Sequence, residues 1–151
     1  MVTRFEQFTS SVASIHRSIQ KIERVEMAKY GLKGPHAQVL LAMSHYPQGI
    51  TSGDLVKSCD KDKAAISRTV AELEREGMVI RQGKNGNFYR ASLTLTERGR
   101  EAAEHVAVRA RQAVEAASNG LSEGDRRGLY NALDLIANHL QTICDVGLTE
   151  E

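Results

Sequence analysis

The chain has 151 residues, of which 41% are hydrophobic and 26% are charged, and its formal net charge is only +1. This length and this hydrophobic content suit a single folded domain with a real core. No apolar run approaches the roughly 20 residues that span a bilayer, and the chain start lacks the apolar stretch of a secretion signal, so we expect a cytoplasmic protein that does not enter a membrane.

Residues 1–33 predict an amphipathic helix with a narrow apolar seam. Its apolar side chains follow the three-four alternation that is typical of a coiled coil: Phe5, Phe8, Val12, Ile15, Ile19 and Ile22. The first of them stand so close to the chain start that one copy of the chain offers them little core. We therefore expect a partner subunit to cover Phe5, Phe8 and Val12.

Two short helices are expected next. Pro35 suits the first turn of a helix that carries Val39 and Met43 and stops near residues 46–49. Thr51 and Asp54 then have the spacing of a capping box, which indicates a helix over 52–58.

A fourth helix over 62–76 and a hairpin over 80–95 follow. Asp62 places a negative charge at the helix start, where the helix dipole favours it, and Gly77 ends the helix. Three apolar residues about one turn apart form its inward stripe: Ile66, Val70 and Leu73. Beyond Gly77 the hydrophobic period changes from 3.6 to about two, and Asn85-Gly86 between the two alternating runs predicts a tight β-turn.

Two helices over 97–151 complete the chain, separated by a break at Asn119-Gly120. Ser122 and Asp125 predict the start of the second. This last helix repeats the seam spacing of the first segment, and four of its residues are expected at a dimer interface: Leu133, Ile136, Leu140 and Ile143. The predicted fold is mainly α with a small β-hairpin. It is a winged helix-turn-helix over 34–96, between dimerisation helices at 1–33 and 97–151, in a single domain.

The outward face of the helix over 62–76 suggests DNA binding. Residues 57–100 carry a formal charge of +4, whereas the rest of the chain carries −3. In a helix-turn-helix the second helix enters the major groove. At about 100° per residue from Ile66, the residues Ala64, Arg68 and Arg75 face outward, with Lys63 and Ser67 on one flank. An ordinary solvated face gives the same pattern, but the hairpin directly after this helix supplies a second contact point and favours a DNA reader.

The stretch D-K-A-A-I-S-R-T-V-A-E-L-E-R-E-G-M-V-I-R, residues 62–81, resembles the multiple antibiotic resistance regulator (MarR) family. The family helix reads approximately D-K-x-x-V-S-R-x-V-x-x-L-E-x-x-G-L-V, and L-T-L-T-E-R-G-R, residues 93–100, matches the end of the second strand. The resemblance implies a homodimeric, sequence-specific transcription regulator on a pseudo-palindromic operator. It favours a ligand-responsive repressor, although an activator is equally compatible with the residues.

The predicted contacts to double-stranded DNA follow from this helix and from the resemblance. The residues are Lys61, Lys63, Ala64, Ser67, Arg68 and Arg75, with Lys84 and Arg90 in the wing. The family wing commonly carries Asp-x-Arg, whereas residues 87–89 here are Asn-Phe-Tyr, without either charge. Either Lys84 or Arg90 replaces the missing arginine, or the wing contacts are weaker.

The cysteines and histidines offer no clear second site. Oxidation of Cys59, just before the reading helix, offers a redox input, but a structural role is favoured for Cys59 and for Cys144. The five histidines lack close ligand spacing, so we expect no metal. No motif indicates catalysis or a cofactor.

A crevice between helices is the predicted site for a hydrophobic small-molecule effector, unless its lining residues are simply core: Ile15, Ile19, Val39, Met43 and Tyr46. Two other functions remain open. One is a winged-helix module that binds a protein instead of DNA, and the other is a protein that only sequesters a ligand.

Overall fold

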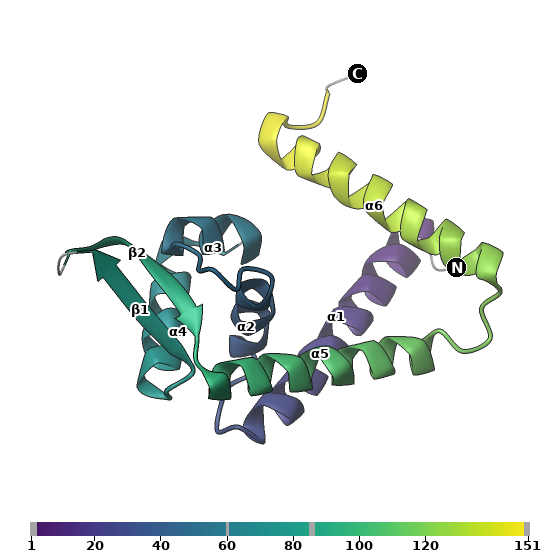
Figure 1. The fold of residues 1–151 in the computed structure, drawn as a ribbon. Coiled ribbons are helices and arrows are strands. Elements are labelled where there is room, and N and C mark those ends of the chain that lie inside the picture. The colour runs from purple at the N-terminus through teal and green to yellow at the C-terminus, as the bar shows by residue number, and fades with distance from the viewer. Residues whose placement is uncertain (1–2, 60, 85–86, 150–151) are drawn as a thin grey trace. The chain divides into compact units, whose positions relative to one another are not determined.

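The computed structural model describes residues 3–59, 61–84 and 87–149 (Figure 1). The chain forms two compact units, Met1–Arg111 and Gln112–Glu151. In chain order the elements are α1 (Arg4–Ala28), α2 (His36–Ser44), α3 (Ser52–Cys59), α4 (Lys63–Arg75), β1 (Val79–Lys84), β2 (Asn87–Leu95), α5 (Glu97–Ala117) and α6 (Glu123–Val146). The predicted fold class, mainly α with a small β-hairpin, is confirmed.

The helix starts coincide with the predicted caps. The Thr51 hydroxyl oxygen accepts a hydrogen bond from the Asp54 N–H at 3.2 Å, and the Ser122 hydroxyl accepts one from the Asp125 N–H at 3.1 Å. Asp62 is the N-cap of α4, where its carboxylate accepts the Ala65 N–H at 2.7 Å. These side chains satisfy backbone donors that have no partner within the helix, which fixes where each helix begins.

The end of α4 sets the path into the hairpin. Gly77 has a φ of +72°, and the next N–H, that of Met78, donates to the Leu73 carbonyl at 2.9 Å. This is the hydrogen-bond pattern of a helix that ends on a left-handed glycine. The chain therefore leaves α4 in a defined direction and enters β1 two residues after Gly77.

The two strands of the hairpin pair antiparallel. The pairing runs from Val79 with Leu95 to Lys84 with Asn87, with an irregularity between Gln82 and Lys84. The predicted Asn85-Gly86 turn lies outside the described residues. The backbone of Ile50 exchanges two hydrogen bonds with Leu93, at 3.0 and 2.8 Å. This bridge joins the segment before α3 to β2 and was not predicted.

The core of the first unit lies between α2, α3, α4, the hairpin and the first half of α5. Its largest fully buried side chains come from all of these elements and from α1, and they include Met27, Leu40, Met43, Leu55, Ile66, Leu73, Met78, Leu93 and Val106. The three residues of the predicted inward stripe of α4 are all fully buried. Burial of this stripe holds α4 against the rest of the unit.

Thr96, the residue before α5, is hydrogen-bonded to the segment that links α4 to β1. The Thr96 N–H donates to the Met78 carbonyl at 2.9 Å, and the Thr96 hydroxyl donates to the Gly77 carbonyl at 2.6 Å. A Cβ atom on Gly99 would lie only 2.0 Å from the Met78 carbonyl oxygen. Only glycine permits this close approach between α5 and the segment that links α4 to β1.

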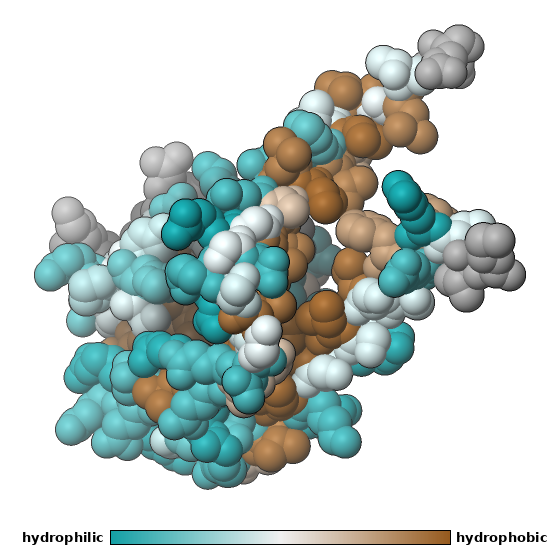
Figure 2. All heavy atoms as spheres, turned by 90° about the vertical axis from the view of Figure 1, so that its right-hand side faces the viewer, coloured by the Kyte–Doolittle hydropathy of each residue, from teal (hydrophilic) through white to brown (hydrophobic). Residues whose placement is uncertain are grey.

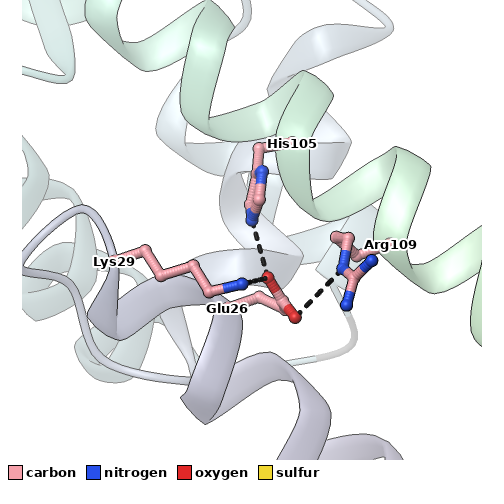
Figure 3. Close-up of polar contacts among 4 residues, drawn as sticks. All are labelled: Glu26, Lys29, His105 and Arg109. Carbon is pink, nitrogen blue, oxygen red and sulfur yellow. Dashed lines mark hydrogen bonds and ion pairs between the residues drawn. The ribbon is translucent and has the colours of Figure 1, made fainter.

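A buried carboxylate joins α1 to α5 (Figure 3). The side chain of Glu26 is only 6% exposed and contacts three nitrogen atoms: Lys29 Nζ at 2.7 Å, His105 Nε2 at 2.6 Å and Arg109 Nε at 3.2 Å. These hydrogen bonds, that of Lys29 above all, lower the pKa of Glu26 to about 2 against the opposing effect of burial. The Glu26 carboxylate is therefore held in its charged form.

Both α1 and α6 carry apolar faces that remain open to solvent, and Figure 2 shows hydrophobic residues on the molecular surface. On α1 these include Phe5, which is 74% exposed, Phe8, Val12, Ile15 and Ile19. None of the residues of α6, all of which the structure describes, is buried, and its exposed apolar residues include Leu133, Ile136, Leu140 and Ile143. Within the described ranges, no helix has both the length and the apolar character to cross a membrane.

Candidate nucleic-acid interface

Helix α4 presents a polar and cationic face to solvent. Lys63, Ala64, Ser67, Arg68 and Arg75 are all exposed. The opposite face of the same helix is the buried stripe of Ile66, Val70 and Leu73. The outward face thus combines two small side chains, which allow close approach, with three cations.

Three other predicted DNA contacts flank this face along the chain. Lys61 is half-buried and lies two residues before α4. Lys84 ends β1 and Arg90 lies in β2, but their side chains are outside the described part of the chain.

Two carboxylates connect α4 to its neighbours. Glu72 Oε2 lies 2.6 Å from His36 Nε2, and Glu72 Oε1 lies 3.7 Å from Lys33 Nζ. The hydrogen bond from His36 lowers the pKa of Glu72, burial opposes this shift, and the charge of Lys33 adds to it. Glu74 accepts hydrogen bonds from Nη2 and Nε of Arg81 in β1, at 2.8 and 3.2 Å.

Only one tautomer of the neutral His36 imidazole fits these contacts. The ring is buried, and its Nδ1 accepts a hydrogen bond from the Lys33 N–H at 3.0 Å. The proton of the neutral ring therefore sits on Nε2, which donates to Glu72. In the sequence, His36 stands out only as one of five scattered histidines, because its partner lies 36 residues away.

The predicted effector residues lie in different surroundings. Val39 and Met43 are core residues, whereas Ile15 and Ile19 are exposed on α1. Tyr46 lines a cavity of about 450 Å³ together with Cys59 and residues of α2. Burial raises the pKa of the Cys59 thiol, with the charge of Lys61 acting in the opposite direction. A raised thiol pKa favours the structural role of Cys59 over a reactive one.

A second cavity, of about 500 Å³, is strongly basic and was missed by sequence reasoning. It lies between α1, the start of α2 and the residue before the N-cap of α4. Its charged lining residues are Arg17, Lys21, Glu23, Arg24 and Lys61. Burial raises the pKa of Glu23, the acidic member of this set, while Lys61 and His16 oppose the shift. The α1 cations are one turn apart, but amphipathic surface helices show the same spacing, so the pattern alone was uninformative.

Comparisons with known proteins agree with this geometry. A family model described as MarR family matches residues 30–86. The HTH-type transcriptional regulator YdgJ of Bacillus subtilis strain 168 is 27% identical over 140 residues, which cover 90% of this chain and 85% of that protein.

Two solved structures share the fold. A MarR family transcriptional regulator from Listeria monocytogenes, complexed with a 26mer DNA, is 20% identical with a TM-score of 0.79, covering 95% of this chain and 97% of that one. The S. aureus MepR–DNA complex is 19% identical with a TM-score of 0.74, covering 91% of this chain and 96% of that one. The chain is therefore similar to MarR family transcription regulators in the match of residues 30–86 to the family model, in its likeness to YdgJ and in its fold.

Proposed function

We propose that this chain is a sequence-specific DNA-binding repressor that acts as a homodimer on a pseudo-palindromic operator and that releases DNA when it binds a small molecule. The observation that carries the proposal is the face of α4, where cations and small side chains are exposed opposite a fully buried apolar stripe. The DNA-bound L. monocytogenes regulator, which shares the fold along almost its whole length, supports it.

Each residue of this face has a role that its chemistry suits. Arg68 pairs with a guanine through two parallel hydrogen bonds in the major groove, while Ala64 lets the helix approach the base edges. Lys63 and Ser67 bind phosphate oxygens, which fixes the register of the helix on the duplex. Lys61 and Arg75 contribute charge, and Lys84 and Arg90 contact the flanking backbone from the wing.

A second copy of the chain covers the exposed apolar residues of α1 and of α6. Side chains such as Phe5 on α1 and Leu140 on α6 each remove apolar surface from water when a partner covers them. A dimer with two-fold symmetry presents two reading helices, which bind half-sites about one helical turn apart. This spacing is the reason for a pseudo-palindromic operator.

The ligand that we propose is a small organic anion in the basic cavity of α1 and α2. Three arginine and lysine residues of α1 and Lys61 line it, so an anion gains from several charges at once. Lys61 directly precedes Asp62, the N-cap of α4. An anion that draws Lys61 inward therefore acts on the start of the reading helix and removes a charge from the DNA-facing surface.

The first test of the proposed function is the variant Arg68→Ala. Because Arg68 is exposed, the variant should fold normally while its affinity for a duplex selected by the wild-type chain falls roughly tenfold to hundredfold. Fluorescence anisotropy of the labelled duplex measures the affinity, and Arg127→Ala on α6 controls for the loss of one positive charge.

Salt dependence separates DNA binding from the protein-binding alternative. Binding through several phosphate contacts falls steeply with rising salt, whereas docking of an apolar protein segment does not. The proposal would be contradicted if Arg68→Ala and the wild-type chain bound the duplex with equal affinity, or if the affinity did not change with salt concentration.

A further inference from the structure

The buried stripe of α4 leaves one motion of the helix poorly restrained. Ile66, Val70 and Leu73 hold the helix along a single line of contact, which resists separation better than rotation about the helix axis. With side chains included, a helix is about 10–12 Å across, so a roll of about 10° moves an outward side chain by about 1 Å. Such a shift at Arg68 is enough to spoil a hydrogen bond to a base edge.

Two carboxylates lie on opposite flanks of the stripe and are tied to different elements. Glu72 precedes Leu73 in the chain and Glu74 follows it. Around the helix axis, each therefore lies about 100° from Leu73, in opposite directions. Glu74 is bound by Arg81 of β1, at 2.8 and 3.2 Å. Glu72 is bound from the other side by His36, the first residue of α2, at 2.6 Å.

The tie through His36 is rigid. The residue is only 4% exposed, and the Lys33 N–H fixes its Nδ1 at 3.0 Å while Nε2 donates to Glu72. A buried ring engaged at both nitrogens does not swing, and a hydrogen bond to a carboxylate is among the stronger kinds. On the helix, Glu72 lies one turn beyond Arg68 and only about 40° around the axis from it.

We infer that His36 is a positioning residue for DNA reading: by holding Glu72 it fixes the roll of α4 and thereby the placement of Arg68. The inference rests on the proposed DNA-binding function. For the removal of Glu72, the inference predicts a change in DNA affinity opposite to the change expected from its charge alone. If Glu72 were merely an acidic group on a DNA-binding helix, its removal would strengthen binding to phosphates. If it holds the helix in place, its removal weakens binding.

The deciding comparison is Glu72→Ala against Glu76→Ala. Both variants remove one negative charge near the end of α4, but Glu76 is exposed, whereas Glu72 is the partner of His36. The probes are a duplex selected by the wild-type chain from a random pool and a scrambled duplex of the same length. Glu76→Ala should bind both at least as tightly as the wild type. Glu72→Ala should lose about tenfold on the selected duplex and little on the scrambled one.

A second pair of variants isolates the two nitrogens of His36. His36→Gln keeps an N–H that reaches Glu72, whereas His36→Asn keeps an acceptor for the Lys33 N–H but is too short for Glu72. The Gln variant should retain most of the preference for the selected duplex, and the Asn variant should behave like Glu72→Ala. Thermal unfolding of each variant confirms that the binding assays use folded protein.

Each result has one meaning. Equal binding of the selected duplex by Glu72→Ala and Glu76→Ala would overturn the positioning role. A wild-type chain that prefers no duplex would instead overturn the proposed function. Should His36→Asn fail to fold, Glu72→Ala still decides, because the Glu72 side chain is 29% exposed and its truncation leaves no large cavity.

Discussion

Glu26 shows how a single charged residue can hold two distant parts of the chain together. Its carboxylate is buried and contacts Lys29 from its own helix and His105 and Arg109 from α5. A buried carboxylate is costly unless its oxygens are paired and hydrogen-bonded, and here both oxygens have partners. The joint between α1 and α5 therefore depends on the charge of one residue.

The stability of the chain should depend on this charge at acid pH. In the folded chain the pKa of Glu26 is about 2, below the ordinary value of 4.5, so the charged form stabilises the fold. This stabilisation is complete above about pH 5 and is lost as the pH falls towards 2. Glu26→Gln should lower the free energy of unfolding by up to roughly 3 kcal/mol at pH 7, a difference that shrinks towards pH 2.

Urea unfolding at fixed protein concentration, repeated at pH 7, 4 and 2.5, measures this trend. The matched control is Glu101→Gln, because Glu101 is an exposed glutamate on α5. A difference between Glu26→Gln and the wild-type chain that stays the same at every pH would contradict the role of the charge.

The sequence predicts some single residues well and others not at all. The outward placement of Ser67 and Arg68 follows from helix geometry alone, since the angle from Ile66 depends only on local structure. Glu26 and His105 are 79 residues apart, and their contact exists only after α1 and α5 have packed. Nothing in the local pattern around Glu26 distinguishes it from a solvent-exposed glutamate.

At the scale of the elements, the signals that start and end helices account for most of the agreement between predicted and observed helix bounds. The caps Thr51 and Ser122 and the glycine after α4 act through hydrogen bonds within a few residues, so the sequence alone contains the information. The bridge between Ile50 and Leu93 was missed because a single bridging residue has no periodicity. The basic cavity was missed for a different reason, since α1 and α2 form it only when packed together.

The packing of α1 against the start of α2 makes the proposed ligand site testable. Benzoate, a small organic anion, should raise the unfolding temperature of the wild-type chain and weaken its binding to the selected duplex. Arg24→Gln should reduce both effects, because Arg24 lines the cavity. Arg4→Gln makes the same charge change on α1 away from the cavity and should leave both effects intact. Equal responses of the two variants to benzoate would argue against this site.

At the scale of the whole molecule, a single copy of the chain leaves apolar residues of α1 and of α6 exposed to solvent. The seam residues of α1 and α6 were predicted from their spacing, and the structure leaves all of them exposed except Ile22, which is half-buried. The spacing of the apolar residues predicts that another surface covers this face. It does not predict how two copies are placed relative to each other, because contacts between the copies determine that placement. The dimer interface therefore stays a prediction, as does the role of each seam residue.

Disrupting the seam of α6 tests the dimer directly. Leu140→Glu places a charge among the exposed apolar residues of α6, where burial by a partner would leave it unpaired. We expect sedimentation equilibrium to show a monomer, with roughly tenfold or greater loss of affinity for a two-half-site duplex. Asn131→Glu adds the same charge on the opposite face of α6 and should remain dimeric. A dimeric Leu140→Glu variant would show that this seam is not the interface.

The close fit at Gly99 has a consequence for how the molecule can respond to a signal. Met78 sits where α4, β1 and α5 meet, and Thr96 and Gly99 hold α5 against its backbone without room for slippage. The 21-residue α5 is therefore fastened near its start to the segment that joins α4 to β1. Under the proposed function, any movement of α5 would therefore shift α4 and the hairpin together, and both DNA contacts would change at once.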